Sequence, residues 1–179
     1  MNCLEAAKRS IYSFVYDYVK PKWGEKAKII GGDTDSVGLY VETEDFYKDI
    51  EPDLEKLFDT SNIKDDNRFG WKTKEKNKNK LYCFKIETDD KIVEKFIGLQ
   101  AKTYIYSFSG QTKQAQKGIP KRKRASYEDF EKVLTTQVEM ETQFNKIMSI
   151  KHNLYTVQCR KTALTAFDDK SYILDDGIT

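Results

Sequence analysis

A glycine- and aspartate-rich turn between two β-prone runs constrains this chain most strongly. Residues 27–30 form a short β-prone run, Gly31-Gly32-Asp33-Thr34-Asp35 follows, and residues 36–41 form a second β-prone run. Glycine and aspartate favour tight turns, whereas valine, isoleucine and tyrosine favour strands. The pattern therefore predicts an antiparallel β-hairpin with two carboxylates at or near its tip.

Asp33 and Asp35 are the carboxylates of this turn. In an extended chain, residues i and i+2 lie on the same face, so we expect the two charges to project together and to repel each other. A divalent cation relieves that repulsion. Magnesium usually takes one or two protein carboxylates together with water and substrate phosphates, and a pair of such ions can stabilise both oxygens of a phosphoryl transfer. The turn therefore suits nucleotidyl transfer, provided that further carboxylates arrive from elsewhere.

Three other interpretations of the same residues stay open. The first is a simple turn, because aspartate and serine side chains satisfy nearby backbone groups. The second is a calcium loop: Asp33, Asp35, Gly38 and Glu44 match the EF-hand pattern, although Val37 lacks the side-chain oxygen that the pattern requires. The third is the Asp-x-Asp metal site of nucleotide-sugar glycosyltransferases.

The flanking patterns predict a mixed α+β chain. Apolar residues at spacings of three and four predict a helix over residues 3–18, ended by Pro21 and Gly24. A second helix is expected after Thr43, which would cap it, with a break or kink at Pro52. Residues 59–80 are polar and lysine-rich, and predict an exposed, flexible connection.

A second β region is expected further along the chain. Residues 82–86 and 92–97 flank a Thr-Asp-Asp turn, and residues 103–108 alternate as a strand that ends at Gly110. Ser126, with Asp129 three positions later, predicts a capped helix. Residues 136–179 mix short apolar runs with charges and predict no definite order of elements.

Charge and cysteine content narrow the functional classes. The net charge is only +2, but residues 42–59 carry eight acids and two lysines, whereas residues 111–126 carry six bases and no acid. The basic run is either a solvated face or a nucleic-acid surface. Three scattered cysteines and one histidine exclude a zinc site of the Cys/His type and fit a reducing intracellular compartment. No apolar run approaches a membrane span and no signal peptide is visible, so we expect no membrane partner.

Three motifs, in order, resemble those of family B DNA polymerases. Residues 29–37 resemble the palm motif in which an Asp-Thr-Asp-Ser turn joins two strands. Residues 96–104 look like the Lys-x-Tyr motif, and residues 115–119 resemble the Lys-Gly segment near the thumb. The likeness is to the organellar and viral, protein-primed branch, which includes polymerases of large DNA transposons. With flanking segments from residue 42 to residue 177, it spans nearly the whole chain.

The resemblance implies an α+β partial palm over residues 1–108, with the flexible segment at about 59–80, and a small thumb and C-terminal region over residues 109–179. It implies that Asp35 and its weaker companion Asp33 are catalytic and bind two Mg²⁺ ions, which they share with an upstream aspartate. The partners it implies are primer–template DNA, deoxynucleoside triphosphates and, in the protein-primed branch, a terminal protein. The DNA-binding residues would be Thr34, Ser36, Lys102, Tyr104, Lys117, Gly118, Lys121 and Arg122.

Other family motifs do not occur in these 179 residues. They are the upstream Asp-x-x-Ser-Leu-Tyr-Pro motif, the finger helix with Asn-Ser-x-Tyr-Gly, and an exonuclease domain. We therefore expect the chain to be the C-terminal part of a polymerase, inactive alone. Gly31 and Gly32 also replace bulkier family residues. The alternative function is a non-catalytic DNA-binding remnant of a transposon or viral polymerase. A nuclear, a virus-associated and an organellar location are all compatible with the sequence.

Overall fold

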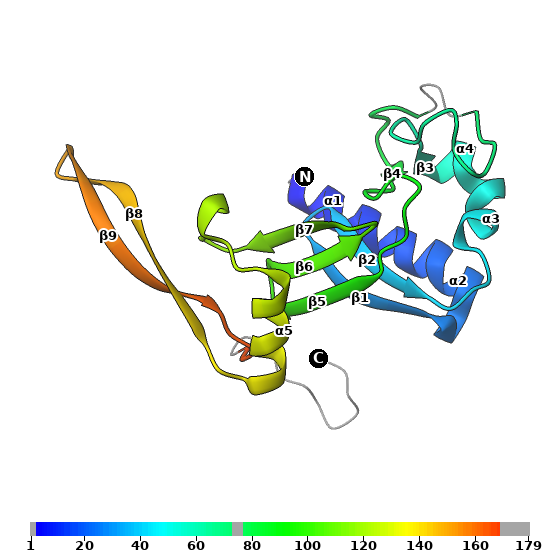
Figure 1. Ribbon diagram of the computed structural model, residues 1–179. Coiled ribbons are helices and arrows are strands. Elements are labelled where there is room, and N and C mark those ends of the chain that lie inside the picture. Colours follow the sequence, from blue (N-terminus) through cyan, green and yellow to red (C-terminus); the bar gives the residue numbers. More distant parts are fainter. Residues whose placement is uncertain (1–2, 73–76, 169–179) are drawn as a thin grey trace. The chain divides into compact units, whose positions relative to one another are not determined.

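The computed structural model describes residues 3–72 and 77–168, and the chain divides into two compact units, Met1–Ile92 and Val93–Thr179. Figure 1 shows helices and small, mostly antiparallel sheets, which confirms the expected α+β class. None of the helices in the described ranges is long and apolar enough to cross a membrane.

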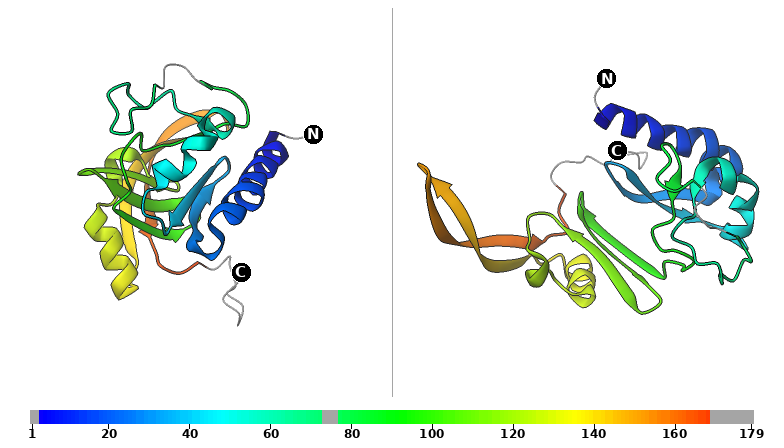
Figure 2. Two further views of the ribbon diagram at one scale, coloured as in Figure 1. Left: turned by 90° about the vertical axis from the view of Figure 1, so that its right-hand side faces the viewer. Right: turned by 90° about the horizontal axis from the view of Figure 1, so that it is seen from above.

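The first unit begins with a continuous helix (Figure 2). It comprises α1 (Cys3–Ser13), the π-helical turn η1 (Phe14–Val19) and α2 (Lys20–Trp23). The prediction that Pro21 ends the helix is wrong. The backbone N–H of Lys20 donates to the carbonyl of Val15, five residues back, and this wider turn admits Pro21 at the start of α2. The helix ends at Gly24, as expected, where the backbone adopts φ +57°.

The predicted hairpin follows. A short 3₁₀ turn, η2 (Gly24–Lys26), leads into β1 (Ala27–Asp33), which pairs antiparallel with β2 (Ser36–Val41). The register runs from Ala27 opposite Val41 to Asp33 opposite Ser36, with a bulge between Ile29 and Gly31. The local sequence was sufficient to predict this element.

The next helical region begins later than predicted. It comprises α3 (Phe46–Ile50), the 3₁₀ turn η3 (Glu51–Asp53) and α4 (Leu54–Leu57). Asp45, rather than Thr43, is the N-cap, since its carboxylate accepts from the backbone N–H groups of Tyr47 and Lys48. Thr43 instead donates its hydroxyl to Asp49. The break at Pro52 is confirmed, because η3 separates the two helices.

The segment that follows α4 contributes to the core of this unit. β3 (Phe58–Asp59) pairs in parallel with β4 (Phe84–Lys85), so residues 82–86 do not pair with residues 92–97 as a hairpin. Asp59, Thr60, Ile63, Asn67 and Trp71 are buried. The prediction that residues 59–80 are exposed is therefore wrong for these five.

The second unit is built on a three-stranded antiparallel sheet. Its strands are β5 (Lys95–Gln100), β6 (Thr103–Phe108) and β7 (Gln111–Gln116), in that order. Helix α5 (Tyr127–Thr136) packs on the sheet, and its Phe130 and Val133 join Ile97, Leu99 and Ile105 in one core. The predicted capping box of Ser126 and Asp129 is present. The expected boundary after residue 108 falls between β6 and β7 of this sheet.

A long two-stranded ribbon completes the second unit. β8 (Met140–Ile150) and β9 (Asn153–Leu164) pair antiparallel along their whole length. Figure 1 shows this ribbon as an arm that extends away from the sheet and α5. Only its base enters the core, through buried Leu164 and half-buried Met140. The sequence did not predict this ribbon.

Candidate functional site

The turn between β1 and β2 places the two candidate metal ligands in different local structures. Asp33 ends β1 opposite Ser36, and the two residues between them are Thr34, with φ +23°, and Asp35. The chain therefore reverses between the two aspartates, and the expectation that they share one face of an extended strand is wrong. Asp33 is half-buried, whereas Asp35 is exposed at the turn.

Hydrogen bonds between residues close in the sequence hold this turn. The hydroxyl of Thr34 donates to Asp33 Oδ1 at 3.0 Å, and the hydroxyl of Ser36 donates to the backbone carbonyl of Asp33 at 3.2 Å. One Asp33 oxygen is thus engaged within the turn. Asp35 is the more exposed of the two carboxylates, and its expected leading role stays a prediction.

Gly32 has a steric reason to be glycine. A Cβ on Gly32 would lie 2.9 Å from the backbone oxygen of Ser36, closer than real Cβ atoms come to such an atom. A Cβ on Gly38, across the hairpin, would meet the Gly31 oxygen at 3.4 Å. A side chain at Gly32 would therefore force the backbone beside the turn to shift, which gives this position a steric reason to be glycine.

The turn supplies two carboxylates of the hard, oxygen-donor type that Mg²⁺ prefers. Within residues 3–72 and 77–168, no group of three or more His, Cys, Asp or Glu side chains could hold a metal ion. Asp33 and Asp35 are thus oxygen donors of the kind that a magnesium site uses, and the described residues bring no third such group to them.

Lys102 and Tyr104 lie at one end of the sheet of the second unit. Gln100 pairs with Thr103, which leaves Lys102 in the β5–β6 turn, exposed and with φ +62°. Tyr104 is half-buried, and its ring lies nearly parallel to the rings of Phe96 and Tyr106, at centroid distances of 6.0 and 6.3 Å. The neighbouring Ile105, not Tyr104, joins the core under α5.

Lys117 and Gly118 lie at the same end of this sheet. Thr103 pairs with Gln116, so Lys102 precedes and Lys117 follows the same pair of residues. The turn after β7 is closed by a bond from the Ile119 N–H to the Gln116 carbonyl at 3.2 Å, and Gly118 has φ +73°, which favours glycine. The sheet register thus brings together two motifs that are separate in the sequence.

The rest of the basic run divides into exposed and structural residues. Lys121 and Arg122 lie in the 3₁₀ turn η4 (Lys121–Lys123), and all three of its side chains are exposed. Arg124 is half-buried and donates from Nη1 to the backbone carbonyl of Gln114 at 3.0 Å. Arg124 therefore covers the β7 edge, whereas Lys121 and Arg122 are exposed.

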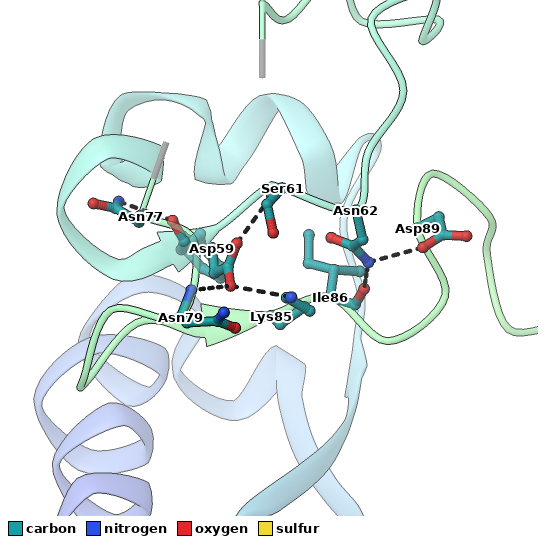
Figure 3. A network of polar contacts seen from close by, with 9 residues as sticks. Asp59, Ser61, Asn62, Asn77, Asn79, Lys85, Ile86 and Asp89 are labelled. Carbon is teal, nitrogen blue, oxygen red and sulfur yellow. Dashed lines mark hydrogen bonds and ion pairs between the residues drawn. The ribbon is translucent and has the colours of Figure 1, made fainter. Parts of the chain in front are cut away.

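The sequence analysis missed the polar network around Asp59 (Figure 3). Asp59 is buried and accepts from the backbone N–H groups of Ser61 at 2.9 Å and Asn79 at 3.1 Å, and pairs with Lys85 Nζ at 3.2 Å. Burial alone would raise the pKa of Asp59, but these donors outweigh it and lower the pKa to about 2. The local signal for this turn is the spacing of Asp59 and Ser61, because an aspartate side chain often accepts from the backbone N–H two residues later.

The ten predicted site residues fall into two groups, one in each compact unit. Asp33, Thr34, Asp35 and Ser36 belong to the first unit, and the six DNA-binding candidates that follow belong to the second. No family model, curated protein or solved structure matches this chain.

Proposed function

We propose that this chain is the palm-and-thumb part of a family B DNA polymerase, acting on primer–template DNA and deoxynucleoside triphosphates. One observation carries the proposal: the Asp-Thr-Asp-Ser string occupies the tip of an antiparallel hairpin, with Asp35 exposed in the two-residue turn. In the family motif, an Asp-Thr-Asp-Ser turn likewise joins two strands. The hairpin also favours a polymerase over an EF-hand loop, because strands rather than helices flank the turn.

The proposed chemistry is the attack of a primer 3′-hydroxyl on the α-phosphate of a nucleotide, with loss of pyrophosphate. Bound Mg²⁺ ions would neutralise the charge that develops on the attacking and leaving oxygens. Asp35 holds its carboxylate at the turn for this purpose, and Asp33 supports it from the end of β1. Another aspartate, of the upstream Asp-x-x-Ser-Leu-Tyr-Pro type, completes the site from outside these residues. The protein contributes mainly positioning and electrostatic stabilisation.

The basic residues of the second unit would bind the duplex through its phosphates. Lys102 and Lys117 share one end of the sheet, and Lys121 and Arg122 follow in an exposed turn. Contacts of this kind are independent of base sequence and weaken with salt, because each one releases condensed counterions. Tyr104, whose ring contacts those of Phe96 and Tyr106, would place its hydroxyl against the primer strand.

Binding and primer extension by the 179-residue chain test this proposal. We expect the purified chain to bind a primer–template duplex, with an affinity that falls steeply as salt rises, and to add no nucleotide in the presence of Mg²⁺. Extension by this chain alone would contradict the need for a further carboxylate. An absence of DNA binding at low salt would contradict the proposal itself.

A non-catalytic DNA-binding remnant is the second candidate. The observation that favours it is that the described residues supply no third carboxylate to the turn. The two candidates separate at the gene. An open reading frame that continues upstream into the aspartate and finger motifs supports a polymerase, whereas an interrupted frame supports a remnant.

A further inference from the structure

A third lysine, which no motif predicted, reaches the end of the sheet that carries Lys102 and Lys117. Lys161 belongs to β9, and its Nζ donates to the backbone carbonyl of Lys117 at 3.2 Å. All three lysines are exposed. A lysine ammonium carries three N–H donors, so two donors of Lys161 remain to bind an anion.

The side chain of Lys161 lies directly against the Lys117–Gly118 turn. A Cβ on Gly118 would meet Lys161 Nζ, so the two groups are in close proximity. Because Nζ is the end of a flexible side chain that could move aside, the reason for glycine at this position is its φ of +73°. Lys161 pairs with Thr142 across the ribbon, so the contact joins the base of the β8–β9 arm to the sheet.

We infer that Lys161 is the third cation of a phosphodiester-binding site formed with Lys102 and Lys117. The inference deepens the proposed DNA binding and rests on it. In this arrangement Lys161 has two roles at once. It contributes a positive charge to the DNA phosphates, and it positions the Lys117–Gly118 turn by holding the Lys117 carbonyl. This hydrogen bond also holds the base of the β8–β9 arm against the end of the sheet where the DNA backbone would pass.

Salt titrations of DNA binding measure the first role. Fluorescence anisotropy with a labelled primer–template duplex, over a series of KCl concentrations, gives the slope of log K against log salt. Loss of one phosphate contact reduces that slope by about 0.9. We expect Lys161→Met to reduce the slope by about one contact and Lys161→Arg to restore it. Lys132→Met, an equal change of charge on exposed Lys132 of α5, is the matched control and should leave the slope nearly unchanged.

The positioning role has a readout that needs no DNA. Hydrogen exchange at the Ile119 amide, which closes the Lys117–Gly118 turn, should be faster in Lys161→Met and close to wild type in Lys161→Arg and Lys132→Met. Unchanged exchange in Lys161→Met would overturn this role.

The outcomes also separate this inference from the proposed function. If Lys102→Met and Lys117→Met reduce the salt slope while Lys161→Met behaves like Lys132→Met, the DNA site stands and Lys161 is not part of it. If Lys102→Met, Lys117→Met and Lys161→Met all leave the slope unchanged, the proposed DNA-binding site fails together with the inference.

Discussion

Two aspartates of the first unit, Asp59 and Asp35, show how differently one fold can treat a carboxylate. Asp59 is 4% exposed. Its oxygens accept hydrogen bonds from two backbone N–H groups and form an ion pair with Lys85. Asp35 is exposed in a two-residue turn. A carboxylate that stabilises a fold takes its donors from the protein, whereas one that binds a metal must keep its oxygens accessible. An Asp→Asn substitution should therefore lower the stability of the fold at position 59. At position 35 it should leave stability nearly unchanged.

The largest effect on stability is expected from Asp59→Asn. The amide keeps the volume of the side chain but turns one acceptor into a donor, which then opposes the Asn79 N–H or the Lys85 ammonium. Loss of hydrogen bonds to a charged, buried acceptor costs about 3 kcal/mol of unfolding free energy. Urea denaturation of the variant and the wild type measures it. A change below about 1 kcal/mol would show that the network does not stabilise this unit.

Acid should reproduce much of this effect in the wild type. The folded-state pKa of Asp59 is lowered to about 2, below its ordinary value, so its contribution to stability is complete above about pH 4 and is lost as pH falls through about 2. The contribution is about 2 kcal/mol. Denaturation curves from pH 6 to pH 2 should therefore converge for wild type and Asp59→Asn. Curves that stay parallel throughout would contradict the assignment.

Gly32→Ala tests the backbone packing behind the Asp35 turn. The new Cβ would meet the Ser36 oxygen at 2.9 Å, so the strands must shift, at a cost of about 1–2 kcal/mol. Gly38→Ala, whose nearest contacts are at 3.4 Å, is the control and should cost less. Equal costs in thermal or chemical unfolding would show that close approach at Gly32 does not fix the turn.

The smallest effect on stability is expected from Asp35→Asn. The exposed side chain can be replaced with a change in unfolding free energy of less than about 0.5 kcal/mol. The same denaturation experiment measures it beside Asp59→Asn. A loss as large as that at Asp59 would mean that Asp35 has a structural role, and the contrast between the two aspartates would disappear.

The elements that the sequence predicted correctly all depend on local signals. The β1–β2 hairpin follows from glycine and aspartate between apolar runs, and α5 follows from the spacing of Ser126 and Asp129. The Asp35 turn and the Lys102 and Lys117 motifs were likewise visible as strings. The sequence did not show that Lys102 and Lys117 lie at the same end of the sheet, because this depends on the pairing of Thr103 with Gln116.

The elements that were missed lack such signals. β7 is a polar run, and the β8–β9 turn has positive φ at Lys151 and His152 in place of the usual asparagine and glycine. The buried segment after α4 is shaped by side chains that bond the backbone. Asn77, for example, donates to the carbonyls of Glu55 and Phe58 at 2.9 and 3.0 Å. Hydrogen bonds of this kind follow no periodic pattern in the sequence. The same holds for the hydrogen bond from Lys161 to the Lys117 carbonyl.

The most direct test of the central claim is primer extension by the complete product of the gene that encodes this chain. Wild type and Asp35→Asn are compared on one primer–template, with Mg²⁺ and all four nucleotides, and DNA binding is measured in parallel by anisotropy. The account predicts that the variant binds DNA like the wild type and loses synthesis by at least about a hundredfold, as expected when a metal ligand of the reaction centre is removed. Undiminished synthesis by Asp35→Asn would contradict it.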